Sequence, residues 1–427
     1  MKRCLILPVL LMMFGAVVPV ASTARAADKP EQDLGALIQA LNERLETQEK
    51  KISTLESKLT DEALQAARHE EIAKIMSEMR ADASRRDSLP QWLDNLKFFG
   101  DFRLRFEHYS ADGAQVKDRN RYRFRLRFGF IKTWLDEQME VGFRLASGGD
   151  DNGRSANQTM TGTFSKKQIW IERVYAKYSP NSIPGLTVIG GKMPNPLETT
   201  DLIWHDDINP EGAAVQYHRE LCGIDVFGNF AHFVLREART GHDTILNVYQ
   251  GGFRMPMPCG VNTMFAAAWY DFENYEDLGV TTSGWNRNTK MINVLARARF
   301  KACGLPWQVY VDWVHNNQDN DETSDFENAD DGYVVGAKVG RNKKKGDWSA
   351  GYAFKYIELN ATPAQLNDDD FGVPSNVGTN VKGHVVRLQY NLTDFLIAGG
   401  NFFLVQPIVG DRDENSFLMQ LQLLWKF

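Results

Sequence analysis

Ser416-Phe417-Leu418-Met419-Gln420-Leu421-Gln422-Leu423-Leu424-Trp425-Lys426-Phe427 is the stretch that decides the fold. Side chains alternate between the two faces of an extended strand. One face here carries only apolar side chains: Phe417, Met419, Leu421, Leu423, Trp425 and Phe427. A strand of a soluble protein seldom ends on an aromatic residue, because chain ends usually fray into solvent. An apolar face that ends in Trp425 and Phe427 is typical of a strand that contacts lipid and meets the membrane interface at its tip. The stretch therefore predicts a transmembrane β-barrel.

The start of the chain has the features of a secretory signal peptide. Lys2 and Arg3 precede an apolar run at 5–20, and Ala24-Arg25-Ala26 supplies the small-x-small pattern of a cleavage site. A retained membrane anchor is the alternative, but the run is shorter than the roughly 20 apolar residues that span a bilayer. We expect residues 1–26 to direct the chain out of the cytoplasm.

Composition excludes several functional classes. The formal net charge is -6, and it becomes -9 once the three basic residues of the signal peptide are removed. An acidic chain is a poor nucleic-acid partner. Beyond the signal peptide no apolar run approaches the roughly 20 residues of a membrane helix. A membrane protein without such helices must be a closed barrel, because lipid cannot satisfy unpaired backbone groups.

A heptad pattern precedes the strands. Apolar or neutral positions recur at alternating spacings of four and three residues: Leu34, Ile38, Leu41, Leu45, Gln48, Ile52, Leu55 and Leu59. Charged residues fill most of the positions between them, so the seam needs another copy of the helix to bury it. A single amphipathic helix packed on its own domain is the alternative. The pattern predicts a periplasmic coiled coil within residues 27–89.

From residue 97 the sequence changes to short alternating runs separated by turn residues, which predicts an all-β domain over 90–427. We count about sixteen antiparallel strands, near 97–109, 119–134, 137–147, 167–179, 185–191, 211–219, 223–235, 244–255, 260–271, 289–301, 306–316, 330–341, 346–358, 382–392, 395–406 and 416–427. Short turns and long loops alternate between them, as in outer-membrane barrels. The long segments at 148–166, 192–210, 272–288, 317–329 and 359–381 are expected to be exposed loops.

One strand argues against a soluble sandwich or propeller. Over 121–128 arginine alternates with an aromatic or leucine side chain, so one face is wholly basic and the other wholly apolar. Such a strand fits water on one side and lipid on the other. The expected pore-lining residues are Arg103, Arg105, Arg121, Arg123, Arg125, Arg127, Arg297 and Arg299. Guanidinium groups stay charged and can pass an anion from one to the next. The alternative is a structural role, with the arginines paired to Asp101, Glu107 and Glu140.

The segment 192–212 is the least ordinary connection. Its apolar residues include Trp204 and would be wasted on an exposed loop, so we expect it to fold against the barrel wall. If it enters the lumen, its carboxylates face the basic strands across the narrowest point: Glu198, Asp201, Asp206 and Asp207. Such a field selects small solutes by charge and width. A loop packed on the outer rim is the alternative.

These features together resemble a known family. The signal peptide, the coiled coil, the strands, the run Gly190-Gly191-Lys192-Met193-Pro194-Asn195-Pro196, the segment Asn209-Pro210-Glu211-Gly212 and the final Phe427 resemble the putative porins of Gram-negative bacteria, relatives of phosphate-selective and general diffusion porins. The resemblance implies trimeric channels constricted by the third loop, and it permits anion preference. The acidic third loop departs from a purely basic anion channel.

Three further groups of residues have some features of other functional sites. His108 and Ser110 share one face of a strand in the His-x-Ser spacing of outer-membrane phospholipases, but the sequence identifies no residue that would orient the histidine. The clusters 205–207, 330–331 and 368–370 offer oxygen or nitrogen ligands without a spacing that specifies a metal. Cys222, Cys259 and Cys303 each precede a glycine in a predicted periplasmic turn, and in an oxidising compartment neighbouring turns are candidates for disulfides.

The sequence thus predicts an outer-membrane porin that passes small hydrophilic solutes and ions passively. It predicts no catalytic residue, cofactor or metal. Expected partners are outer-membrane lipid and lipopolysaccharide, two further copies of the chain, and the cell wall through the coiled coil. A structural tether, with the coiled coil as its working part, is the first alternative, and a lipid hydrolase is the second. An aqueous lumen distinguishes the porin from the tether, because about sixteen strands leave a channel whereas about eight are filled by side chains.

Overall fold

The computed structural model describes residues 42–50, 74, 77, 93–112, 118–149, 153–275, 289–317, 328–410 and 414–427. The chain divides into two units, Met1–Asp94 and Asn95–Phe427. In the first, residues 42–50 are helical and exposed. The predicted signal peptide and most of the predicted heptad seam lie outside the described residues. Among the described residues no helix combines the length and the apolar character needed to cross a membrane.

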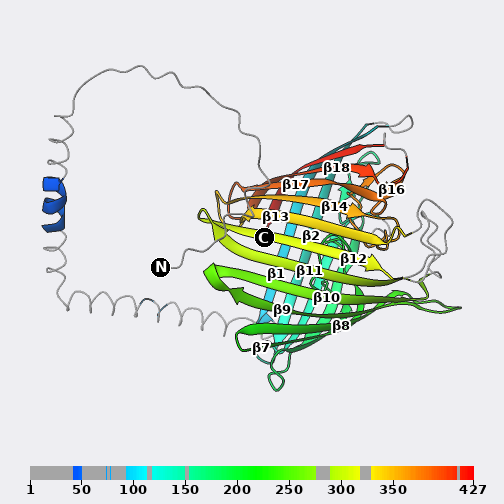
Figure 1. Ribbon diagram of the computed structural model, residues 1–427, viewed down its shortest axis with the longest axis horizontal. Helices are drawn as coiled ribbons and strands as arrows, with labels where there is room; N and C mark the ends of the chain where they lie inside the picture. Colours follow the sequence, from blue (N-terminus) through cyan, green and yellow to red (C-terminus); the bar gives the residue numbers. More distant parts are fainter. Residues whose placement is uncertain are drawn as a thin grey trace, which may run out of the picture. The chain divides into compact units, whose positions relative to one another are not determined.

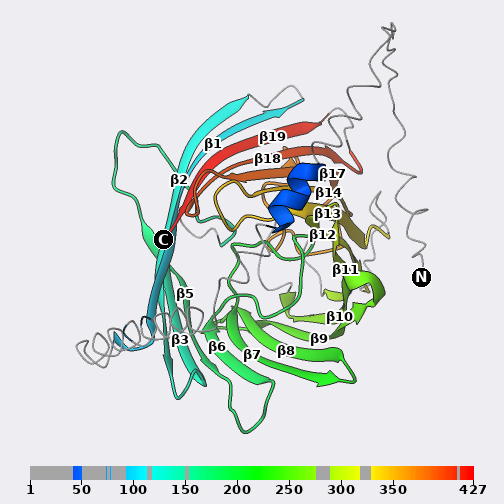
Figure 2. The ribbon, with the colours of Figure 1, turned by 90° about the vertical axis from the view of Figure 1, so that its left-hand side faces the viewer.

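The second unit is a closed antiparallel barrel of sixteen strands, as the sequence predicts (Figures 1 and 2). The strands are β1 (Leu96–Ala111), β2 (Arg119–Trp134), β3 (Met139–Ser147), β5 (Ile169–Tyr178), β6 (Leu186–Lys192), β7 (Glu211–Leu221), β8 (Ile224–Arg236), β9 (Thr244–Met257), β10 (Val261–Glu273), β11 (Lys290–Ala302), β12 (Leu305–Asn316), β13 (Asp331–Gly340), β14 (Trp348–Ile357), β17 (Val381–Asn391), β18 (Leu396–Pro407) and β19 (Ser416–Lys426). The two-residue strand β4 (Gln158–Thr159) extends the β2 edge, and β15 (Gly372–Val373) pairs with β16 (Asn376–Val377) in a small separate hairpin.

The barrel closes where β1 pairs with both β2 and β19. Phe427 exchanges two backbone hydrogen bonds with Gly100, with N···O distances of 2.8 and 3.1 Å. The Phe427 ring lies over Gly100 so closely that a Cβ there would be 2.5 Å from the ring. Because position 100 is a glycine, the Phe427 ring can pack over β1.

Alternation along each strand separates two environments. On β2 the side chains of Tyr122, Leu126 and Phe128 are exposed on the outer face, whereas Arg123 and Arg125 are buried on the inner face. The same division places Val309, Val311 and Trp313 outside on β12. On β2 an apolar outer face and a basic inner face are what lipid outside and water inside require.

Short turns and long loops lie at opposite ends of the barrel. Cys222, Cys259 and Cys303 occupy three of the short turns, each with positive φ and each followed by a glycine with positive φ. Such pairs of residues form the tight turns that match strand twist. Cys222 and Cys303 are exposed free thiols. The prediction that cysteines of neighbouring turns form disulfides is therefore wrong for these two residues.

Loop 3, residues 193–210 between β6 and β7, turns into the barrel instead of extending outward (Figure 2). A backbone hydrogen bond from Met193 N to Pro210 O, 2.8 Å long, closes its neck. Gly191 and Gly212 flank that neck with φ of 115° and 145°, and a Cβ on either would meet a carbonyl oxygen of the neighbouring strand. Only glycine fits at these two positions without strain, which accounts for the glycines in the sequence pairs 190–191 and 211–212.

Apolar side chains of loop 3 form the core of the barrel interior. Met193, Leu197, Leu202, Ile203 and Trp204 are all less than 10% exposed. They pack with inward side chains from β8 to β14. At about 1.5–3 kcal/mol for each buried large side chain, this packing holds the loop firmly inside.

Loop 7, residues 358–380 between β14 and β17, also folds inward. Ala361, Phe371 and Val373 are buried in the same apolar cluster as loop 3. The expectation that 359–381 is an exposed loop is therefore wrong. Its Gly, Asp and Asn residues serve tight turns and buried hydrogen bonds, such as that from Asn367 Nδ2 to Gly378 O at 2.7 Å.

Candidate functional site

The carboxylates of loop 3 contact basic side chains around much of the barrel wall. Glu198 lies 2.7 Å from an Arg254 nitrogen on β9 and 3.1 Å from an Arg297 nitrogen on β11. Asp201 lies 2.9 Å from Lys355 Nζ on β14 and 2.7 Å from Arg387 on β17. Burial opposes the ionisation of Asp201, but Lys355 and Arg387 outweigh it and hold its pKa well below the usual value.

Asp207 joins the loop to the opposite wall. Its carboxylate lies 3.6 Å from Arg125 and 3.4 Å from Arg127, both on β2. Burial alone would raise the pKa of Asp207. The attraction of these arginines and of His205 is stronger, and it lowers the pKa to about 2. Of the four acidic residues singled out in the loop, only Asp207 therefore pairs with the second-strand arginines. Glu198 and Asp201 pair with bases on β9, β11, β14 and β17.

Asp206 and Trp204 have different surroundings. The Trp204 ring is buried, packs 5.8 Å from the Phe233 ring, and donates from Nε1 to Ile208 O at 3.2 Å. Trp204 is therefore a structural anchor of the loop. Asp206 is exposed within the lumen and makes no ion pair with any described residue. Partial desolvation and the neighbouring Asp201 carboxylate raise the pKa of Asp206.

The arginines of β1 and β2 form two clusters with acids on the same wall. Asp101 lies within 2.8 Å of both Arg125 and Arg127. Glu107 has Arg121, Arg123 and Arg105 nitrogens within 2.8, 3.2 and 3.4 Å. These are the cross-strand pairs of the structural alternative. Glu140 instead contacts Lys177 and Tyr175.

Two cavities lie on either side of loop 3. The loop-side cavity, about 440 Å³, is lined by arginines of β1, β2, β3, β5 and β17 and by aspartates of loops 3 and 7. The turn-side cavity, about 300 Å³, lies toward the short turns among β11 to β17. Asp201, Asp206, Arg387 and Gln389 line both cavities. These four residues therefore lie between the two spaces and line each of them.

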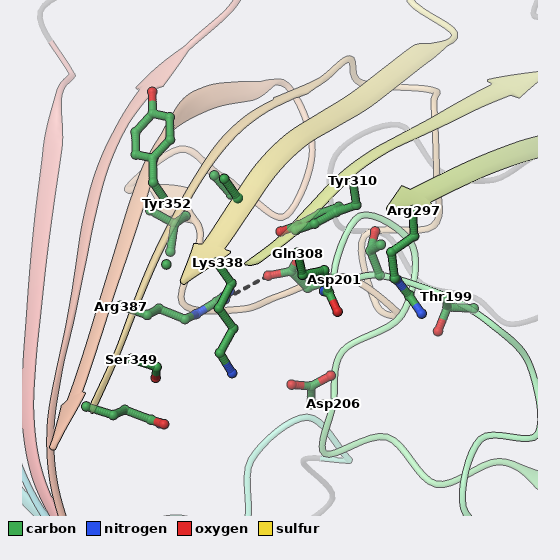
Figure 3. Close-up of a pocket in the computed structure, with 16 residues that line it drawn as sticks. Thr199, Asp201, Asp206, Arg297, Gln308, Tyr310, Lys338, Ser349, Tyr352 and Arg387 are labelled. Atoms are coloured by element: carbon green, nitrogen blue, oxygen red, sulfur yellow. Dashed lines mark hydrogen bonds and ion pairs between the residues drawn. The ribbon is translucent and has the colours of Figure 1, made fainter. Parts of the chain in front are cut away.

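Figure 3 shows the turn-side cavity. Arg297, Lys338 and Arg387 reach into it from β11, β13 and β17, and Asp206 reaches in from loop 3. Tyr310 lies flat against the wall, because a Cβ on Gly336 would sit 2.3 Å from its ring. The cavity thus has basic groups on the strands and a carboxylate on the loop.

The eight predicted wall arginines divide among these places. Arg103, Arg105, Arg125 and Arg127 line the loop-side cavity, and Arg297 lines the turn-side cavity. Arg121, Arg123 and Arg299 are not among the lining residues of either. Arg299 is exposed and donates from Nε to Gln308 Oε1 at 3.0 Å.

Sequence reasoning missed the partners of loop 3. Lys355 and Arg387 occupy inward positions of the predicted strands 346–358 and 382–392, so alternation alone could have placed them in the lumen. Nothing in the sequence indicated that both would meet Asp201. The aspartates of loop 7 were considered only as metal ligands, and their contacts with the barrel wall were missed because an acidic loop is ordinarily solvated.

Loop 7 contacts loop 3 through a titratable cluster. His205 Nε2 lies 3.8 Å from Asp368 and 3.7 Å from Asp369, close enough for the three residues to be considered as cation ligands. The backbone N–H of Asp207 donates to His205 Nδ1 at 3.1 Å, so the neutral ring carries its proton on Nε2. A ring in that state has no lone pair to offer on Nε2. The geometry therefore favours a contact between the loops over a metal site.

His108 and Ser110 lie on the outer face of β1, and His108 Nδ1 is 2.8 Å from Asn120 Oδ1 on β2. An orienting amide, which the sequence did not reveal, is thus present. The same contact recurs between His232 and Asn247, again at 2.8 Å, where Val234 stands in the place of the serine. The recurrence shows that the contact is a cross-strand pair near the ends of the strands and needs no nucleophile beside it.

A family model described as "Putative porin" matches residues 112–304 and 308–421. The chain belongs to this porin family. Among solved structures it is similar to OprB of Pseudomonas putida, with a TM-score of 0.53 and 13% identity over 79% of this chain and 96% of that one. A mutant of the Rh. blastica porin matches with a TM-score of 0.44 and 10% identity, over 78% and 100% of the two chains. A search of curated proteins found no match.

Membership in the porin family agrees with the sixteen-strand barrel. The family and the fold together support an outer-membrane porin channel and indicate an outer-membrane location. They point to a channel rather than to an enzyme.

Proposed function

We propose that the chain is a passive diffusion channel for small hydrophilic solutes and ions, constricted where loop 3 faces the basic strands. The observation that supports this proposal is that two polar cavities share Asp201, Asp206, Arg387 and Gln389 as lining residues. A solute crossing the barrel passes from the loop-side cavity, past these side chains, into the turn-side cavity. A tether with a filled barrel would have no need of such a passage.

The charges near this passage support selection by a transverse field. Loop 3 contributes carboxylates and the strands contribute guanidinium groups, and most of them are held by ion pairs. Fixed charges of opposite sign on facing walls orient a polar solute without binding it tightly. Because acids and bases are nearly balanced, we expect weak ion selectivity and no strict phosphate selectivity.

The assembly belongs to the same proposal. We infer a homotrimer whose outer apolar band contacts lipid and lipopolysaccharide, with residues 27–89 as a periplasmic coiled coil following a signal peptide at 1–26. The exposed Leu45 in helix 42–50 supports a seam that awaits a partner copy. In this proposal the coiled coil also contacts the cell wall.

Single-channel recording in planar bilayers tests the channel. The purified protein should give stepwise conductance in KCl, and a salt gradient should give a reversal potential. Replacing Arg123 and Arg125 with alanine should move that potential toward cation preference, because Asp101, Glu107 and Asp207 lose positive partners. The matched control Arg341→Gln removes a positive charge from an exposed short turn. Absence of any conductance in the folded wild-type protein would overturn the proposed function and favour the tether.

A further inference from the structure

The charges of the loop-side cavity are unequally compensated. Eight arginines and six aspartates line it, and most are paired with each other or with acids behind them. Arg125 and Arg127 share Asp101 and Asp207, for example, and Arg144 pairs with Glu172. Paired charges contribute little attraction for a solute, so the remaining ones decide which solutes are held.

Arg103 is the first exception. Its side chain lies on β1 beside Arg125, its partner in register, and it is only 8% exposed. Among the described residues it makes no ion pair, and its one side-chain partner is the amide oxygen of Asn157, 2.5 Å from Nη2. Its buried Nε has no acceptor. Burying a guanidinium group that has only a neutral partner costs desolvation free energy, unless an anion binds to it.

Arg173 on β5 resembles Arg103. It donates from Nε to Asn209 Oδ1 at 2.5 Å, and no carboxylate of the described chain lies within ion-pair distance. The cavity therefore has two guanidinium groups that are satisfied by amide oxygens alone. Both face a space that an oxyanion can enter.

Asp206 is an exception of opposite sign, and Asp369, whose described ion-pair neighbour is His205, is a second one deeper in loop 7. Asp206 lines the same cavity, is exposed to it, and has no basic partner among the residues that the structure places. Its neighbours in the loop, Asp201 and Asp207, each have two. One cavity thus offers two guanidinium groups without an ion pair on the wall and a carboxylate without an ion pair on the loop.

We propose that the loop-side cavity is a binding site for small zwitterions, with the solute's carboxylate at Arg103 and its ammonium group at Asp206. A simple anion of the same size leaves Asp206 without a partner and is repelled by it, and a simple cation meets the arginines. A zwitterion satisfies both charges at once. The cavity volume of about 440 Å³ is within the range of small-molecule sites. This inference rests on the proposed channel and adds to it the class of solute.

The test is a set of matched solutes on the full chain in planar bilayers at pH 7.5. Glycine, β-alanine and 4-aminobutanoate vary the separation between the two charges. Acetate, propionate and butanoate carry only the anionic end, and the corresponding alkylammonium ions carry only the cationic end. We expect at least one ω-amino acid to reduce the KCl current at a concentration about tenfold lower than either of its single-charge analogues, as expected for one added charge-assisted contact.

Two variants assign the site. Asp206→Asn removes an exposed carboxylate that holds no structural ion pair, and Arg103→Gln removes the wall cation while keeping a donor toward Asn157. Both should lose the tenfold preference, measured as the fractional block of whatever KCl current each variant carries, and Arg341→Gln should keep that preference. Equal effects of the ω-amino acids and their single-charge analogues, or a preference that survives in Asp206→Asn, would overturn the zwitterion site. Loss of KCl conductance in the wild-type protein would instead overturn the channel itself, so the two failures are distinguishable.

Discussion

Lys355 of β14 lies 2.9 Å from the Asp201 carboxylate of loop 3, and its side chain is completely buried. The same ammonium group is 3.3 Å from Asp368 of loop 7 and 5.0 Å from the centre of the Phe371 ring. One lysine thus joins both inward loops to the wall. Arg387 on β17 adds a second contact to each of the two aspartates.

Replacing Lys355 with methionine should loosen both loops. The variant leaves buried carboxylates with fewer positive partners, and removing one member of a buried ion pair typically costs about 3–5 kcal/mol. Because Arg387 remains, we expect a loss of about 3 kcal/mol in the free energy of unfolding, together with more current noise in the open channel. Thermal unfolding in detergent and single-channel recording measure the two effects. Lys338→Met is the control, because Lys338 is exposed in the lumen and has no ion pair in the described chain. Unfolding at the wild-type temperature in Lys355→Met would show that the loops are held by apolar packing alone.

The barrel was predictable because each strand carries its own pattern. Lipid on one side and polar groups on the other impose a two-residue period, and the period is visible in 119–134 without knowledge of any partner. The inward course of loop 3 was predictable from apolar residues that have no use in solvent. The inward course of loop 7 was not predictable from the sequence. It depends on the contacts of Asp368 with Lys355 and Arg387, and only closure of the barrel brings these residues together. The pairing of Glu198 with Arg254 and Arg297 likewise depends on how far the loop reaches across the lumen.

Ion preference should change with pH through Asp369. Burial, together with the like charge of Asp370, raises the pKa of Asp369 to about 6, although His205 and Arg154 act in the opposite direction. Lowering the pH from 7.5 to 4.5 therefore removes one negative charge from the loop-side cavity, and the reversal potential should move toward anions with a midpoint near pH 6. The folded state also binds this proton more tightly than the unfolded chain, so this carboxyl adds stability as the pH falls below its folded pKa.

Two variants distinguish the contribution of the Asp369 carboxylate to the pH dependence from that of the His205 imidazole. Asp369→Asn should abolish the step near pH 6, and His205→Gln should retain a step while changing its midpoint. Asp207, with a pKa of about 2, stays ionised throughout this range and provides a constant background. A step of full size in Asp369→Asn would assign the titration to another group.

Gly336 should control the width of the turn-side cavity. An added Cβ would lie 2.3 Å from the Tyr310 ring, so Gly336→Ala must push that ring away from the wall and into the space that it lines. We expect a lower single-channel conductance, restored by the double variant Gly336→Ala with Tyr310→Ala. Gly351→Ala is the matched control on the neighbouring strand, because its Cβ would meet nothing closer than 3.8 Å. An equal loss of conductance in both glycine variants would mean that Tyr310 is not responsible.

Cys222 and Cys303 report the orientation of the barrel. Both are exposed free thiols in short turns, at the end opposite to loops 3 and 7. If the short turns face the periplasm, a membrane-impermeant maleimide should label neither residue in intact cells and should label both after the outer membrane is opened. Mass spectrometry of tryptic peptides distinguishes the two sites, and the Cys222→Ser and Cys303→Ser variants identify each product. Labelling of either thiol in intact cells would place the short turns outside and reverse the direction in which solutes meet the two cavities.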